Sequence, residues 1–577
     1  MTILNADGAR TFEKIKRGLN ISGYEGNLLR ENYEFTDVLS SELLVKTIPL
    51  ATFSQDPPSY QNACLGVAVS NDMSGVRLIS EYRSLGAPQI FEVTPGGMSR
   101  WKISGREPPQ HIENIEIQNI LNYFDVNKNI LSPTCISRAK SSFNNIHEYQ
   151  LDFLDIALIP LLDKEVQNKF DRLLTQIIDN AIKDFPEIKG NYNKLFRLIF
   201  RLIAAKLLSD RKQPGHWLQQ DPRMVIKEVE NYYFSDRIPE PVLENYDIQY
   251  QIWSSITKSF CFQNLSFETL AYVYENTLMT PEMRKQTSTH GTPPIIAEYI
   301  VKHLPFEQIN ENERQIFEPF SGHAVFLVAA LRRLRELLPS SLRPEQRHSY
   351  FVRMLSGIEY EEFAREISIL SLILADYPNP NGWNMYAGDV FQTDRLTNEI
   401  KKANIILCNP PFEDFSRKEQ TSYLNLRSKH KPVEILNRIL NRPPKLLGFV
   451  LPRTFLTGGG YKDVRNRLSS TYSDIEILAL PENVLKYSQA DTVALLASGT
   501  KQKCIHLKVG QVYENNLDEF YSTYTPSYSN QIEIVATPNM FSNSIWIPEL
   551  GEIWEYLRGN EKLGKHAQIH RGIEYNF

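Results

Sequence analysis

The chain has 577 residues, too many for one ordinary hydrophobic core, so its length predicts about two to four domains. Its hydrophobic share of 42% and charged share of 23% are typical of a soluble globular protein. The net charge of -5 argues against a surface coated for nucleic acid, although it is compatible with a local basic face.

The cysteines and the amino terminus indicate the cellular compartment of the protein. Five cysteines lie far apart, with neither metal-ligand spacing nor a disulfide framework, at Cys64, Cys135, Cys261, Cys408 and Cys504. This usage favours a reducing, cytoplasmic setting and predicts no metal site. The amino terminus has no apolar signal segment, and the apolar runs are far shorter than the ~20 residues of a membrane helix. We therefore expect a cytoplasmic protein with no membrane partner.

Residues 1–140 read as a small N-terminal α/β domain whose role the sequence does not reveal. Turns rich in Pro, Gly and Asn separate strand-like runs at 43–53, 62–70, 76–84 and 87–93. The turn at Pro95-Gly96-Gly97 predicts a hairpin. A restriction-type nuclease would end such a sheet with Glu-x-Lys, but Glu92 is followed by Val93 and Thr94, so nuclease chemistry is not favoured.

Residues 145–290 are predicted to form a helical domain. Apolar residues recur at three- and four-residue spacing in the segments 151–162, 170–182 and 193–211. We interpret the basic residues of the last segment as a solvated face. The polar stretch 280–291 is typical of a surface loop or a domain junction.

Residues 291–505 change to short apolar strands that alternate with helices. The predicted strands include 316–320, 355–360, 385–388, 403–411, 446–452 and 475–481. This alternation predicts a Rossmann-like α/β domain with a mainly parallel, doubly wound sheet. Such sheets bind ligands at the carboxyl ends of their strands. Residues 506–577 then form a C-terminal extension of strands and turns.

The turn Asn409-Pro410-Pro411-Phe412 follows one of these strands and has a chemical interpretation. An exocyclic amine on a base is a poor nucleophile because its lone pair is delocalised into the ring. The Asn409 side-chain oxygen and the Pro410 carbonyl can accept hydrogen bonds from both N–H groups and so favour a nucleophilic nitrogen. Prolines stiffen the turn, and Phe412 offers a face on which an extruded base can stack. The alternative is a plain Pro-Pro turn after a strand.

Three earlier strand ends also carry residues suited to a nucleotide-like ligand. Glu318-Pro319-Phe320-Ser321-Gly322 ends a strand and enters a helix, where a glycine permits close backbone approach. Glu359 ends the next strand and can hold a ribose diol. Asp389 follows another strand and can accept an exocyclic amino group. Each acidic residue alone is usually a helix cap, but their register ahead of Asn409 favours a binding site.

The order Thr292-Pro293-Pro294, EPFSG, GIE, GDVF and NPPF resembles the gamma class of N6-adenine DNA methyltransferases. The helical segment before residue 290 resembles the N-terminal helical domain of type I and type IIG restriction-modification methylases, so the likeness covers about residues 150–500. It implies direct methyl transfer without a metal. It also implies that S-adenosylmethionine is bound by Thr292, Pro293, Glu318, Pro319, Gly322, Glu359 and Asp389. The flipped adenine would be held by Asn409, Pro410, Pro411 and Phe412, with Tyr487 packing against it.

The sequence departs from that pattern on the donor side and after the catalytic domain. Glu318 stands where the family usually has Asp, Ala324 where it has a second glycine, and Gly291 where it has Tyr. The added methyl group of Ala324 bears on donor affinity. Residues 506–577 resemble the start of, or a junction to, a target-recognition domain, so recognition would come from a separate specificity or restriction subunit or from a longer chain. The basic segment 417–445 either contacts phosphates or is an exposed basic surface.

Three functional hypotheses follow. The leading one is a site-specific adenine-N6 DNA methyltransferase of a restriction-modification or phage-defence system, with double-stranded DNA as substrate. The second keeps the chemistry and changes the acceptor to an RNA base or a protein glutamine. The third is a DNA-binding scaffold subunit that keeps the fold but has lost donor binding through Ala324.

Overall fold

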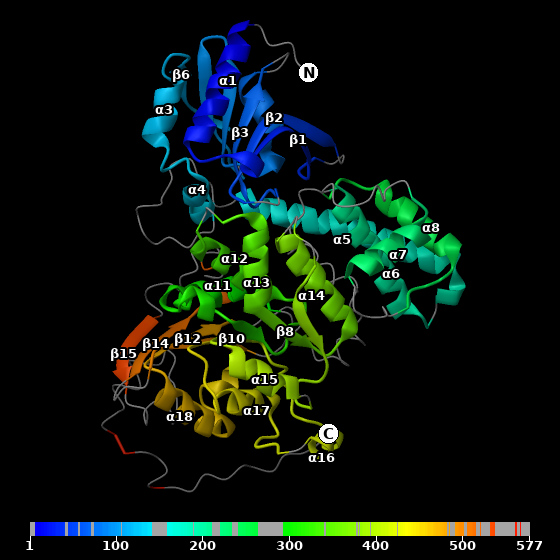
Figure 1. The fold of residues 1–577 in the computed structure, drawn as a ribbon, viewed down its shortest axis with the longest axis vertical. Helices are drawn as coiled ribbons and strands as arrows, with labels where there is room; N and C mark the ends of the chain where they lie inside the picture. Colours follow the sequence, from blue (N-terminus) through cyan, green and yellow to red (C-terminus); the bar gives the residue numbers. More distant parts are fainter. Residues whose placement is uncertain are drawn as a thin grey trace.

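A computed structural model describes residues 6–140, 158–262, 292–514 and 531–536, with short gaps inside the first three ranges and isolated residues beyond them. Figure 1 shows an N-terminal α/β unit at the top, a large α/β unit below it, and a group of helices to the right of the level where the two meet. Within the described residues, no helix is long and apolar enough to cross a membrane.

The N-terminal unit is built on a six-stranded sheet in the order β1-β2-β3-β4-β5-β6. The strands are β1 (Leu29–Thr36), β2 (Val45–Phe53), β3 (Ala63–Val69), β4 (Gln89–Thr94), β5 (Gly97–Lys102) and β6 (Gln110–Glu116). Helices α1 (Ala6–Ile21) and α3 (Ile120–Asn127) share a hydrophobic core with the sheet. The expected turn at Gly96 and Gly97 joins β4 to β5, which pair antiparallel.

One predicted strand of this unit was wrong. Residues 76–84 contain the short helix α2 (Gly75–Ser80) and a 3-10 turn, not a strand. The reason lies in the topology, because β3 and β4 on either side of this segment are parallel neighbours. A chain that leaves one strand and enters a parallel neighbour must cross back over the sheet, and a helix usually makes that crossing.

Among the described residues, the second part contains four helices after α4 (Pro133–Lys140). They are α5 (Leu158–Asp184), α6 (Tyr192–Asp210), α7 (Pro222–Tyr233) and α8 (Tyr246–Thr257). Helix α6 lies in the middle of the group, and from Leu195 to Leu208 nearly every side chain is buried. An amphipathic pattern had predicted the helix, while its burial on all sides comes from packing between α7, α8 and the large α/β unit.

The large α/β unit contains, within the described residues, a nine-stranded sheet in the order β15-β14-β12-β13-β11-β10-β7-β8-β9. Its strands are β7 (Ile316–Glu318), β8 (Leu355–Glu359), β9 (Asn384–Ala387), β10 (Ile405–Cys408), β11 (Leu446–Pro452), β12 (Asp474–Leu480), β13 (Thr492–Ser498), β14 (Ile505–Gln511) and β15 (Gln531–Ala536). Five neighbouring pairs are parallel and three are antiparallel, so the sheet is mixed with a continuous parallel part.

Helices cover both faces of this sheet (Figure 1). On one face, α11 (Pro294–His303), α12 (Val325–Leu337), α13 (Pro344–Met354) and α14 (Glu362–Ala375) contribute to one hydrophobic core. On the other face, α15 (Asp394–Lys402), α17 (Lys431–Ile439) and α18 (Lys462–Thr471) contribute to a second core. The short helix α16 (Arg417–Ser422) lies at the surface. The two cores explain why the strands read as continuous apolar runs.

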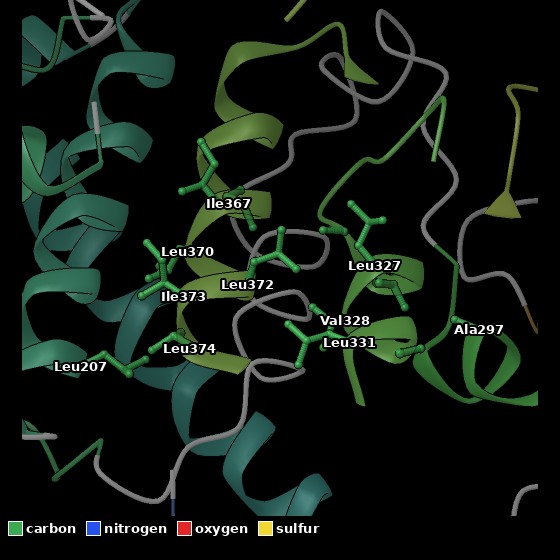
Figure 2. Close-up of a cluster of buried hydrophobic side chains, with 14 of the residues drawn as sticks. Leu207, Ala297, Leu327, Val328, Leu331, Ile367, Leu370, Leu372, Ile373 and Leu374 are labelled. Atoms are coloured by element: carbon green, nitrogen blue, oxygen red, sulfur yellow. The ribbon is translucent and has the colours of Figure 1, made fainter. Parts of the chain in front are cut away.

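The first of these cores continues through all three parts of the molecule. It includes Ile90 and Trp101 of the N-terminal sheet and most of the buried face of α6. Figure 2 shows α14 between its neighbours, with Leu207 of α6 beside one side and Leu327 and Leu331 of α12 beside the other. The helix that follows β8 is therefore held by the helical part as well as by the sheet.

The sheet continues past the boundary that we expected at residue 505. Strand β14 begins at Ile505 and pairs with β12, and β15 pairs with β14. These strands extend the same sheet at the edge opposite β9, so residues 505–511 and 531–536 belong to its architecture.

Candidate functional site

The order of the strands brings the predicted site residues to one edge of the sheet. Strand β7 has β8 on one side and β10 on the other, all parallel. The chain runs from β7 outward to β8 and β9, then returns to β10, so its direction of winding reverses between β7 and β10. Crevices form at such a switch point, outside the carboxyl ends of the strands. Glu318, Glu359 and Asn409 lie at those ends.

Asn409 is oriented by a residue far away in the sequence. Its Nδ2 donates a hydrogen bond of 2.9 Å to Thr292 Oγ1, and Thr292 is buried just before α11. Since one end of the amide is committed as a donor, the orientation of the other end is fixed, and Asn409 Oδ1 is buried next to the strand end. The Thr-Pro segment and the Asn-Pro-Pro turn therefore form one unit.

The other residues of the turn differ in how far they are buried. Pro410 is buried, while Pro411 and Phe412 are half-buried. Phe412 packs against the core that contains α11 and α12. Pro293 precedes the first turn of α11 with an extended ψ of 136°, and Pro294 opens the helix.

Glu318 is a carboxyl group that forms no ion pair among the described residues. It ends β7 with 3% of its surface exposed, and its Oε2 has no hydrogen-bond partner among the described residues. Burial raises the pKa of Glu318 well above its usual value, against a backbone hydrogen bond from Leu327, and the nearby Glu359 adds to the rise. Burial therefore favours the neutral form of this carboxyl group, and one of its oxygens has no donor among the described residues.

Glu359 binds the backbone of two loops. Its Oε2 accepts a hydrogen bond of 2.8 Å from Gly322 N, and its Oε1 accepts one of 2.9 Å from Glu361 N. Burial raises the pKa of Glu359 to about 7 despite these bonds. The loop after β7 is thus tied to the end of β8 by the acidic residue that the sequence singled out.

The loop after β7 contains two residues in the left-handed region. Gly322 has φ 51°, and Ala324 has φ 66° and ψ 31°. Alanine pays for this conformation, roughly 1–2 kcal/mol, because its Cβ approaches the following carbonyl. Ala324 is fully buried, and its N–H donates to Ser321 O. The resemblance expects a second glycine at position 324. The left-handed backbone conformation at this position is one that glycine adopts without strain.

Asp389 follows β9 and is half-buried, with both of its oxygens engaged. Oδ1 accepts a hydrogen bond of 2.8 Å from Phe391 N. Oδ2 accepts one of 2.6 Å from the hydroxyl of Tyr423. Tyr423 comes from the segment that follows the Asn-Pro-Pro-Phe turn, so this contact joins the two predicted halves of the site.

Sequence reasoning missed Tyr423 and the aromatic cluster around it. Its ring stacks on Phe391 at 6.1 Å and meets Phe415 edge-on, and Phe320 of the β7 loop lies 5.7 Å from Phe391. Arg438 also lies over Phe391, with its guanidinium 5.3 Å from the ring centre. The only signal in the sequence was the recurrence of aromatic residues after the strand ends, which does not say that they meet.

Of the remaining residues named from the sequence, Glu92 lies in the N-terminal sheet, apart from this edge. Tyr487 falls outside the described residues. Glu92 of β4 is buried in the N-terminal sheet, where it accepts hydrogen bonds from Trp101 Nε1 and Gly75 N, so its carboxylate is used in local structure. No cluster of possible metal ligands occurs among the described residues.

Several solved structures overlap this chain loosely. The DrdV–DNA complex gives a TM-score of 0.49 at 10% identity, over 91% of this chain and 57% of that one. The type IIG restriction endonuclease BpuSI gives 0.42 at 12%, over 94% and 64%. The methyltransferase subunit of a type I restriction-modification system from Streptococcus thermophilus gives 0.40 at 12%, over 66% and 98%. Overlaps this loose carry no functional argument, and this chain spans little more than half of the DrdV chain.

Sequence comparison gives a match over one segment of the chain. No curated protein matches the chain. Residues 266–512 match the family model described as N-6 DNA Methylase. The segment that contains every strand end described above therefore has the sequence pattern of an N-6 DNA methylase.

Proposed function

We propose that this chain transfers a methyl group from S-adenosylmethionine to the N6 amino group of an adenine in double-stranded DNA, as a gamma-class enzyme of a restriction-modification system. The observation that carries the proposal is the hydrogen bond from Asn409 Nδ2 to Thr292 Oγ1. It orients the amide so that Oδ1, the end that the chemistry needs as an acceptor, is directed away from Thr292.

On this proposal, the residues of the turn prepare the acceptor nitrogen. Asn409 Oδ1 and the carbonyl of Pro410 accept hydrogen bonds from the two N–H groups of the adenine amino group. These bonds favour a pyramidal N6 whose lone pair is no longer conjugated with the ring. Pro411 limits the backbone freedom of the turn. Phe412 is half-buried, so part of its ring is available for stacking on an extruded base.

The donor side has the features that a nucleoside with an amino-acid tail requires. Glu318 presents a buried oxygen that has no donor among the residues that the structure describes, which suits a ligand that brings N–H or O–H groups. Glu359 would accept the ribose hydroxyls and Asp389 the amino group of the adenine ring, with Thr292, Pro293, Pro319 and Gly322 shaping the backbone around them. When bound, the donor supplies a methyl group on a positively charged sulfur.

The test is transfer of labelled methyl from S-adenosylmethionine to DNA of mixed sequence. We expect labelled N6-methyladenine from the wild-type chain and a loss of about 100-fold or more from Asn409→Ala, because one of two essential acceptors is removed. Thr292→Val and Thr292→Ser form a matched pair: the first removes the hydroxyl that orients Asn409 and should lower the rate, while the second keeps it.

If the label appears in RNA or in protein glutamine, DNA is not the substrate, and the proposed methyl-transfer chemistry stands. Equal labelling by wild type and Asn409→Ala would refute the mechanism. A scaffold subunit is the second candidate, favoured by the strained Ala324 in the donor loop. Calorimetry with S-adenosylhomocysteine separates it from the enzyme, since a scaffold without donor binding gives no heat at any pH between 6 and 8.5.

A further inference from the structure

Two arginines stand side by side on the outer surface of the large α/β unit without a carboxylate between them. Arg427 lies in the segment before α17, and Arg467 lies on α18. Arg427 Nη1 and Arg467 Nη2 both donate to Asn441 Oδ1, at 3.3 Å and 3.1 Å. Among the described residues, neither guanidinium forms an ion pair, whereas other arginines of this unit do, namely Arg332, Arg333, Arg335, Arg365, Arg438 and Arg453.

The two side chains are held in this arrangement before any ligand arrives. Arg467 Nη1 also donates to the backbone carbonyl and the side-chain oxygen of Asn437, at 3.1 Å and 2.9 Å. Arg427 is fixed through its backbone, since its N–H donates to the buried carboxylate of Glu434 at 2.9 Å. That carboxylate is engaged on its other oxygen by Arg438 Nε, so it does not neutralise the pair.

Holding two like charges around one neutral oxygen is unfavourable unless an anion joins them. Burial and the neighbouring Arg427 guanidinium lower the pKa of Arg467, which reports this repulsion. Asn441 and Arg427 are exposed and Arg467 is partly exposed, so the site opens to solvent. Guanidinium groups bind phosphate oxygens with paired hydrogen bonds, and fixed guanidiniums lose little side-chain freedom when they do so.

We infer that Arg427 and Arg467 form a binding site for a phosphate group, and that the phosphate is a backbone phosphodiester of the nucleic acid. The choice of the backbone over a free phosphate rests on the proposed function. It also rests on position in the chain, because Arg427 belongs to the same segment as Tyr423, which begins directly after Phe412 and returns to contact Asp389. A duplex anchored at Arg427 is held by the loop that follows the acceptor turn.

The experiment measures binding of a 20-base-pair duplex to the full chain by fluorescence anisotropy between 20 and 200 mM salt. Non-specific backbone binding needs no recognition subunit. We expect Arg427→Ala to weaken binding about tenfold at low salt, as for the loss of a hydrogen bond to a charged group. We also expect it to reduce the slope of log Kd against log salt by about 1, as for one phosphate contact. Arg467→Ala should act in the same way.

The matched control is Arg333→Ala, which removes the same charge from α12, where Arg333 is paired with Glu307 and Glu336. It should leave the slope unchanged. Arg427→Lys keeps the charge and should keep the slope while losing part of the affinity. Because Arg427 is exposed, its substitution does not threaten folding, and circular dichroism checks Arg467→Ala.

Equal slopes for Arg427→Ala, Arg467→Ala and Arg333→Ala would overturn the inference, as would the absence of any duplex binding at 20 mM salt. A second arm titrates inorganic phosphate and follows thermal stability. Phosphate could stabilise the wild type but not Arg427→Ala, while duplex binding is the same in both. The site would then bind a free anion, and the assignment of nucleic acid as its ligand would be wrong. Donor binding is measured separately, so loss of the proposed methyl transfer and loss of this site give different results.

Discussion

At the scale of single residues, the hydroxyl of Tyr423 donates to Oδ2 of Asp389 and so competes with the proposed donor amino group for this carboxylate. Tyr423→Phe removes this competing hydrogen bond while keeping the ring stacked on Phe391. A hydrogen bond to a charged group is worth about 1.5 kcal/mol or more, so we expect S-adenosylhomocysteine to bind about tenfold more tightly. Calorimetry measures the change. Weaker binding would mean that Tyr423 supports Asp389 instead of competing for it.

The pKa of Glu359 predicts a pH dependence with a definite sign. Burial raises this pKa to about 7, so the carboxyl group becomes neutral as the pH falls below that value. The neutral form accepts ribose hydroxyls less well, and donor affinity should fall toward tenfold per pH unit below pH 7. Calorimetry at pH 6 to 8.5 measures it, and Glu359→Gln should bind weakly with a flat profile. For the free protein the linkage runs the other way, because a raised pKa contributes stability below pH 4.5 that is lost as the pH rises through 7.

Ala324 allows a test of backbone strain. Glycine at this position would relieve the left-handed conformation, worth roughly 1–2 kcal/mol, but it would lose a buried methyl group and make the unfolded chain more flexible. These terms nearly cancel, so Ala324→Gly should change the free energy of unfolding by less than about 1 kcal/mol. Ala324→Val adds a β-branched side chain to the same conformation and should lose more than about 2 kcal/mol. Urea denaturation of both variants measures these changes. Without backbone strain at this position, Ala324→Gly would lose the buried methyl group with no compensating gain and would destabilise the protein by more than about 1 kcal/mol.

At the scale of elements, sequence patterns predicted local structure better than they predicted contacts between elements. The hydrophobic runs at 355–360 and 403–411 became β8 and β10 because a strand buried on both faces is apolar throughout. The run at 76–84 was predicted as a strand and became α2, because the parallel pairing of β3 and β4 is not encoded locally. The same limit applies to the site: Asn409 was found from its motif, whereas the hydrogen bond of Tyr423 to Asp389 depends on how the loop folds back.

Ion pairs of Arg201 on α6 connect the helical part to helix α14 of the large α/β unit. This side chain is 2% exposed and pairs with Glu230 of α7 and Glu366 of α14. Arg201→Met would remove the ion-pair partner of the buried Glu366 and of the half-buried Glu230, and it should destabilise the protein by about 3–5 kcal/mol at pH 8. Burial raises the pKa of both Glu230 and Glu366, so at pH 5 they become neutral more readily and the loss should shrink. Urea denaturation at the two pH values checks this, and an equal loss at both would show that Arg201 acts through packing alone.

At the scale of the whole molecule, the continuous core predicts that the donor site and the N-terminal sheet share their stability. That core contains Ile90 of β4, Leu207 of α6 and Leu327 of α12, and Arg335 of α12 also donates to Gln55 of the N-terminal unit at 3.1 Å. A ligand at 100 times its Kd stabilises the folded state by about 2.7 kcal/mol, which slows exchange through global unfolding about 100-fold. If the core unfolds as one unit, saturation with S-adenosylhomocysteine should slow amide hydrogen exchange in β3 and β4 by the same factor as in β7 and β10. Asp389→Ala, with donor binding weakened, should show little change in either sheet. Protection confined to β7 and β10 would mean that the N-terminal sheet unfolds independently, despite the side chains it contributes to the common core.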